Sequence, residues 1–225
     1  MSTSIRIILN EKLYLRNPDE TELGRRIIVQ SISTIDELGF ENFTFKKLAV
    51  AMESTEASIY RYFENKHKLL IYLISWYWVW LDYQIGFKTN NIKSAGERLR
   101  IVVKVLSEAQ VNDPETSIDE SALHRIVVVE SSKAYLTKEV DAANQEGLYR
   151  EYKKLCKKIA EIVLEINPTY KYSHTLVSTI IEASHDQVFF AFHLPSLTDI
   201  KIKNNDYSQL EEYLEHLIFS AIQTN

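Results

Sequence analysis

Hydroxyl and cationic side chains that could hold phosphate groups gather in one short stretch of the chain. Ser54 and Thr55 precede an apolar-periodic segment, where hydroxyls and the free N–H groups of a helix start bind phosphate oxygens. Arg61 follows two turns later as a cation of phosphate-reaching length. Ala57 and Ser58 are short, so their helix could enter a groove about 12 Å wide. The chemistry indicated is contact with a nucleic-acid duplex.

Two short helices, predicted over residues 45–52 and 55–63, must position these side chains. Each helix has apolar residues at helical spacing, which define one buried face; they are Leu48, Ala49 and Met52, then Ile59, Tyr60 and Phe63. We expect these faces to pack on an earlier helix that starts at Asn17-Pro18 and ends at Gly39. The result would be a helix-turn-helix on a three-helix core.

The rest of the chain also reads as helical. Five Gly and four Pro in 225 residues favour long helices over a turn-rich β architecture. Caps and periodicity predict about nine helices in an all-α fold, near residues 19–39, 45–52, 55–63, 65–87, 95–110, 118–136, 148–166, 170–194 and 207–223. Three parts follow: an N-terminal arm with a possible short hairpin over 1–18, the helix-turn-helix domain over 19–70, and a helical domain over 71–225.

Charge is distributed unevenly along the chain. The net charge is −5, yet residues 1–70 hold ten Lys/Arg and ten Asp/Glu, so the acidic excess lies in the remainder. DNA affinity needs cations near phosphates and does not need a basic protein as a whole. The single cysteine, Cys156, excludes an internal disulfide framework. We see no signal peptide and no uncharged run long enough for a membrane span, and therefore expect a cytoplasmic protein with no membrane partner.

Residues 25–70 resemble the DNA-binding domain of the TetR (tetracycline repressor) family of bacterial transcriptional regulators. Several spaced features carry the resemblance: ELGF at 37–40, Thr44, Leu48-Ala49, YRYF at 60–63, and Lys66 before Leu69-Leu70. The resemblance implies a DNA-reading face, and the residues expected on it are Thr44, Lys46, Ser54, Thr55, Glu56, Ala57, Ser58, Tyr60, Arg61, Tyr62 and Lys66.

Some of these positions have two interpretations. Core packing is favoured for Tyr60, whereas phosphate contact and partial burial are equally compatible with Tyr62. Of the adjacent Lys46 and Lys47, at most one is expected to reach DNA. Two acids depart from the family pattern: Glu53 stands where a Gly is frequent, and Glu56 where a Lys is frequent. Glu56 could accept from a cytosine amino group or cap its helix, and we favour the cap.

Candidate ligand-binding residues come from the aromatic run after residue 75 and from later helices: Trp76, Trp80, Tyr83, His124, His185 and Phe189. A structural role for the aromatic run is favoured over a pocket wall. No His pair has the spacing that clamps a metal from one helix, so neither a metal site nor a cofactor is expected. Cys156 among lysines could sense redox state, although a small apolar role is favoured.

These observations predict a DNA-binding transcriptional regulator with no catalytic residues. The resemblance implies a homodimer through the last two helices and a near-palindromic operator. Repression is expected to respond to an apolar or aromatic small ligand, held between the fourth to eighth predicted helices, that shifts the helix over 65–87. The alternative is a helical small-molecule or lipid carrier whose helix-turn-helix no longer reads DNA.

Overall fold

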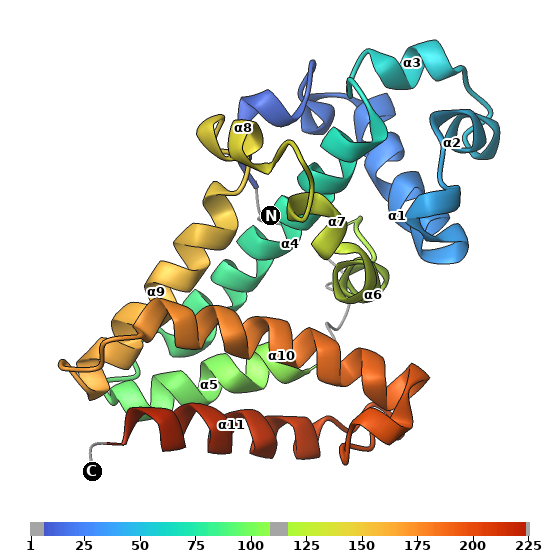
Figure 1. The fold of residues 1–225 in the computed structure, drawn as a ribbon. Coiled ribbons are helices and arrows are strands. Elements are labelled where there is room, and N and C mark those ends of the chain that lie inside the picture. Colours follow the sequence, from blue (N-terminus) through green and yellow to red (C-terminus); the bar gives the residue numbers. More distant parts are fainter. Residues whose placement is uncertain (1–6, 109–116, 224–225) are drawn as a thin grey trace. The chain divides into compact units, whose positions relative to one another are not determined.

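The structure is a computed structural model that describes residues 7–108 and 117–223 (Figure 1). The described residues form eleven α-helices and three 3₁₀ helices, with no strand beyond one isolated bridge between Lys203 and Asp206. The all-α prediction is therefore confirmed. The predicted N-terminal hairpin is not formed within residues 7–15, because a 3₁₀ helix, η1 (Glu11–Leu13), occupies its centre. None of the described helices is long and apolar enough to cross a membrane.

The chain divides into two compact units. The first unit joins residues 1–78 with 110–151, and the second joins residues 79–109 with 152–225. This division differs from the predicted boundary at residue 70, because a segment from the middle of the chain packs with the N-terminal helices. Two helices, α4 (Lys66–Thr89) and α9 (Arg150–Ile166), run from one unit into the other.

The first unit is built around a three-helix core. The core helices are α1 (Glu22–Asn42), α2 (Phe45–Ala51) and α3 (Glu56–Tyr60). The unit also contains α6 (Glu120–Glu130), α7 (Ser132–Tyr135) and α8 (Val140–Gln145). Side chains from α1, α2, α3, the segment after α3 and the start of α4 are almost fully buried; they include Ile32, Ile35, Leu48, Ile59, Phe63 and Leu69. The packing faces expected from helical spacing are thus present except at Tyr60, which is exposed.

Side-chain caps fix where the helices start. Asn65 starts α4 as predicted, since its Oδ1 accepts from the Lys68 N–H at 2.9 Å. Asn17 instead caps a 3₁₀ helix, η2 (Pro18–Glu20), and α1 is capped by Thr21, whose Oγ1 accepts from Gly24 N–H. The helix predicted from residue 118 starts as α6 at Glu120, and Asp119 caps it by accepting from Ala122 N–H.

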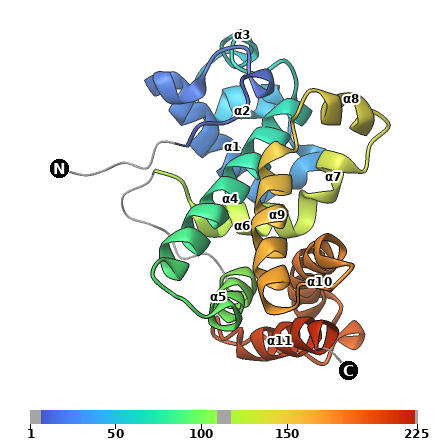
Figure 2. The same cartoon turned by 90° about the vertical axis from the view of Figure 1, so that its left-hand side faces the viewer.

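The second unit has three helices packed side by side, α5 (Ala95–Ser107), α10 (Ser173–His193) and α11 (Ser208–Ile222) (Figures 1 and 2). Leucines, valines and isoleucines fill the space between them, including Val102, Val103, Ile180, Ile181, Leu214 and Ile218. Ion pairs also stabilise the unit: the Asp82 carboxylate lies 2.6 Å from Lys158 Nζ and 3.3 Å from Lys154 Nζ.

Candidate nucleic-acid interface

A tight turn separates α2 from α3 and sets the angle between them. Glu53 has φ of +52°, in the left-handed region that non-glycine residues rarely adopt. Two hydrogen bonds close the turn: Ser54 N–H donates to Ala49 O at 2.9 Å, and Glu53 N–H donates to Val50 O at 3.1 Å. This is the helix-ending pattern that usually places Gly at the left-handed position. Glu53 therefore forms the turn without a glycine.

The start of α3 presents a hydroxyl cluster. Thr55 Oγ1 accepts from Ser58 N–H at 3.3 Å and lies 3.0 Å from Ser58 Oγ. Arg61 Nη2 donates to the same Ser58 Oγ at 3.4 Å, so its guanidinium lies along the exposed face of α3. The cap that we favoured for Glu56 belongs to Thr55, and Glu56 lies exposed in the first turn of the helix.

The two tyrosines of the YRYF segment have opposite environments. Tyr60 is 48% exposed and packs the edge of its ring on Phe45, with 4.9 Å between ring centroids. Tyr62 is only 2% exposed, and its Oη lies 2.7 Å from Thr21 Oγ1. Because α3 ends at Tyr60, helical spacing does not continue to Tyr62, and the Tyr62 side chain is buried. The predicted DNA contact by Tyr62 is wrong in this structure, as is the favoured core role of Tyr60.

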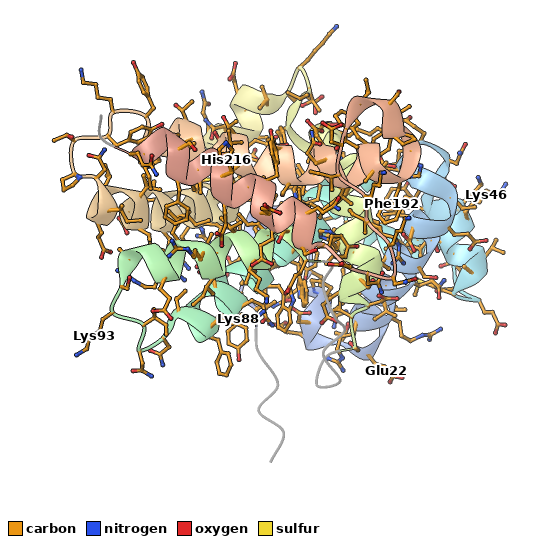
Figure 3. The ribbon with its side chains drawn as sticks, turned by 90° about the horizontal axis from the view of Figure 1, so that it is seen from below. Glu22, Lys46, Lys88, Lys93, Phe192 and His216 are labelled. Carbon is orange, nitrogen blue, oxygen red and sulfur yellow. The ribbon has the colours of Figure 1, made fainter. Side chains whose placement is uncertain are left out.

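Three lysines near this surface are used differently. Lys46 is exposed and forms no ion pair with any described residue; Figure 3 labels it near the outer edge of α2. Lys47 Nζ donates to Asn42 O at 2.8 Å, which ties it to the end of α1. Lys66 Nζ lies within 3.3 Å of three backbone carbonyl oxygens. Lys46 is thus the member of the adjacent pair that remains available for DNA.

An outward face remains above the three-helix core. Its exposed members are Thr44, Lys46, Thr55, Glu56, Ala57, Tyr60 and Arg61, with Ser54 and Ser58 half-buried. Val50, which was not predicted on this face, is 73% exposed on α2, the helix that also carries Lys46. A cation, hydroxyls and small side chains on two short helices suit phosphate and base-edge contacts in a major groove.

The candidate ligand-binding residues are divided between the units. Trp76 and His124 are buried in the first unit, where Tyr77 Oη lies 2.9 Å from His124 Nδ1. Trp80 and His185 are buried in the second unit, and burial lowers the pKa of His185 to about 4. Tyr83 is 41% exposed there and stacks on Trp80 at 5.6 Å. Phe189, also in the second unit, is half-buried.

Neither a metal site nor a reactive thiol is indicated. Over residues 7–108 and 117–223, no three His, Cys, Asp or Glu side chains are grouped to hold an ion. Burial raises the pKa of the Cys156 thiol to about 11, despite the lysines beside it in sequence. The thiol is therefore protonated near neutral pH and is a poor nucleophile, so the apolar role that we favoured fits it better than redox sensing.

The geometry is that of a helix-turn-helix, and comparison with known proteins shows which family this part of the chain resembles. Residues 27–73 match the family described as bacterial regulatory proteins, tetR family. This match confirms the predicted resemblance to the TetR family and the prediction of a DNA-binding transcriptional regulator. A comparison with curated proteins found no match.

Three solved structures share the fold at low sequence identity. AibR in complex with isovaleryl coenzyme A and operator DNA has a TM-score of 0.61 and 17% identity, covering 88% of this chain and 98% of its own. The fatty acid degradation regulator FadR from Bacillus halodurans has a TM-score of 0.59 and 16% identity, covering 90% and 95%. A TerR/AcrR family transcriptional regulator from Aquifex aeolicus VF5 has a TM-score of 0.53 and 13% identity, covering 89% and 96%.

Proposed function

We propose that this regulator is a ligand-responsive repressor that binds a near-palindromic operator as a homodimer. The observation that carries the proposal is the outward face of α2 and α3, where Lys46, Thr55 and Arg61 are exposed above a buried three-helix core. Two such faces related by a two-fold axis would read two half-sites of opposite orientation. The operator is therefore expected to be an inverted repeat.

Selection of duplexes from a random library by the full-length protein tests this reading. An inverted repeat should be enriched, and its affinity should fall steeply with salt because phosphate contacts release counterions. Enrichment of no sequence at low salt would contradict the repressor and favour a helical carrier with an inactive helix-turn-helix. The Arg61→Met variant should bind the selected duplex more weakly, while Lys93→Met, at an exposed loop residue of the second unit, should bind normally.

The homodimer is proposed to form through α10 and α11. Large apolar side chains remain exposed in this part of the second unit, where Phe192 is 54%, Leu197 59% and Tyr213 41% exposed. Figure 3 labels Phe192 beside the end of α10 and His216 on α11. Burying such residues between two copies would stabilise association by the hydrophobic effect.

Sedimentation of the purified protein tests the dimer. The wild type should sediment as a dimer, and the Phe192→Glu/Tyr213→Glu double variant as a monomer, because it would bury two unpaired charges. Phe87→Glu is a suitable control, since Phe87 is 72% exposed at the end of α4. A wild-type monomer at micromolar concentration, or loss of the dimer only in the control, would contradict the proposed interface.

The proposed ligand is an acyl-coenzyme A whose apolar acyl group enters the helical domain. Two observations support this class: AibR is similar in fold and was solved with isovaleryl coenzyme A, and FadR is named as a fatty acid degradation regulator. The ligand would act by favouring a conformation with a shifted α4, the helix that continues from the first unit into the second.

Thermal unfolding with a series of acyl-coenzyme A thioesters tests the ligand. A thioester at a hundred times its Kd should stabilise the protein by about 2.7 kcal/mol, and coenzyme A alone should stabilise it less. The same thioester should release the selected duplex. Equal stabilisation by coenzyme A and by every thioester would contradict recognition of the acyl group.

A further inference from the structure

The ammonium group of Lys66 binds three backbone carbonyls at the corner between α1 and α2. Gly39 breaks the helical path with φ of +72°, and the chain then turns through Phe40 toward Thr44, the cap of α2. Lys66 Nζ, from the first turn of α4, donates to Phe40 O at 2.9 Å, Phe43 O at 3.1 Å and Glu41 O at 3.3 Å. These three acceptors match the three N–H bonds of an ammonium.

The ammonium also neutralises an unfavourable helix end. The last carbonyl groups of a helix have no partner within it and carry partial negative charge, which a cation stabilises. Lys66 Nζ lies 4.6 Å from the centroid of the Phe40 ring, which adds a cation–π contact. A phosphate would have to compete with all of these contacts for the same charge.

The Glu130 carboxylate also binds this corner, at a backbone N–H group. Glu130, at the end of α6, is 4% exposed, and its Oε1 accepts from Phe40 N–H at 3.0 Å. Its Oε2 pairs with Lys133 Nζ at 2.7 Å, and Lys133 also pairs with Glu41 at 3.1 Å. Phe40 is therefore bound at its N–H by Glu130 and at its carbonyl by Lys66.

We infer that Lys66 and Glu130 are positioning residues for DNA binding, which act by fixing the corner over residues 39–43 and not by contacting DNA. Thr44 follows this corner directly and starts α2, so a displaced corner tilts α2 and moves Lys46. Because α3 packs on α2 through the Phe45–Tyr60 ring contact, the reading face moves with it. This role replaces the phosphate contact that the sequence predicts for Lys66.

The salt dependence of DNA binding separates positioning from contact. The probe is one duplex selected by the wild-type protein, and its Kd is measured from low to moderate salt. Each lost phosphate contact lowers the slope of log affinity against log salt by about 0.9. Lys46→Met should lower this slope. Lys66→Met should weaken binding about tenfold or more with the slope unchanged.

Three further substitutions complete the test. Lys66→Arg keeps the charge but replaces the compact ammonium with a planar guanidinium group, which cannot donate to three converging carbonyl oxygens. This variant should therefore bind DNA more weakly than the wild type. Glu130→Ala removes an acid, which would strengthen binding if charge alone mattered; positioning predicts weaker binding at an unchanged slope. Glu130→Gln keeps an oxygen that can accept from Phe40 N–H and should bind within about threefold of wild type.

Circular dichroism at the binding temperature verifies that each variant is folded, and the Glu130 variants give an independent answer if Lys66→Met unfolds. Full affinity in Lys66→Arg together with a reduced slope in Lys66→Met would overturn the inference for Lys66. Tighter binding by Glu130→Ala would overturn it for Glu130. Failure of the wild type to select any duplex would instead contradict DNA binding itself.

Discussion

Glu53 occupies a backbone conformation that favours glycine, at φ of +52° in the turn of the helix-turn-helix. A left-handed residue with a Cβ costs about 1–2 kcal/mol, part of which glycine loses again through its larger entropy in the unfolded chain. Glu53→Gly should therefore stabilise the fold by about 0.5–1 kcal/mol, measured as a shifted midpoint of urea unfolding. Glu53→Ala keeps the strain and should give no such gain. A lower midpoint for Glu53→Gly would contradict the conformation.

The tyrosines at 60 and 62 differ in what their hydroxyls do. Tyr62→Phe should lower the free energy of unfolding by about 1 kcal/mol, because it removes the buried contact between Tyr62 Oη and Thr21 Oγ1. Tyr60→Phe should change it by less than about 0.5 kcal/mol, since Tyr60 is exposed. Chemical denaturation of the two matched variants measures both values. A larger loss of unfolding free energy for Tyr60→Phe than for Tyr62→Phe would contradict the burial of Tyr62 after the end of α3.

The candidate DNA site was predictable in part. Periodicity located the packing residues other than Tyr60, and the resemblance to the TetR family placed Thr44, Thr55 and Arg61 on an outward face, where all three are exposed. Periodicity could not show that Tyr60 is exposed and Tyr62 is buried, because α3 ends at Tyr60 and helical spacing does not hold beyond that residue. The role of Lys66 depends on carbonyls far away in sequence, so no local pattern could reveal it.

At the scale of elements, η2 and α1 approach closely at Gly24. A Cβ on Gly24 would lie 2.2 Å from Pro18 O and 2.5 Å from Pro18 Cα, so the backbone of η2 would have to move. Gly24→Ala should destabilise the protein by about 1–3 kcal/mol in thermal or urea unfolding.

Gly96→Ala is the matched control for this contact. Gly96 lies in the first turn of α5, and a Cβ there would meet no atom closer than 3.9 Å. The substitution should be neutral or stabilising by up to about 1 kcal/mol, because alanine is the better helix former. Similar losses in both variants would contradict the close approach at Gly24.

The longer helices were predictable because each has a cap and a sustained apolar period. Asn65 and Ser94 start α4 and α5 as predicted. The helix predicted over residues 118–136 is divided at Ser131 into α6 and α7. The short helix α8 was missed, since it has no side-chain cap and is too short to show a period. The division into units was also not predictable, because it depends on α6 packing against α1.

For the whole molecule, His185 links stability to pH. Burial lowers its pKa from 6.5 to about 4 in the folded state, so the unfolded chain takes up the proton first as the pH falls. Its contribution to stability is complete above pH 6.5 and is lost between pH 6.5 and about 4. A shift of this size corresponds to roughly 3 kcal/mol.

Unfolding free energies of the wild type and His185→Leu between pH 7 and 4 measure this linkage. Other groups also lose stability in acid, so the comparison isolates His185: the variant should show the shallower decline. Parallel pH profiles for the two proteins would show that His185 is not buried in its neutral form.

The central claim is that the face formed by α2 and α3 reads duplex DNA. The most direct measurement is the affinity of wild type and Lys46→Met for a duplex selected by the wild type and for a shuffled duplex, over a range of salt concentrations. We expect tighter wild-type binding to the selected duplex, and a salt slope reduced by about 0.9 for each lost contact in the variant. Equal affinity for both duplexes, or a slope unaffected by Lys46→Met, would contradict it.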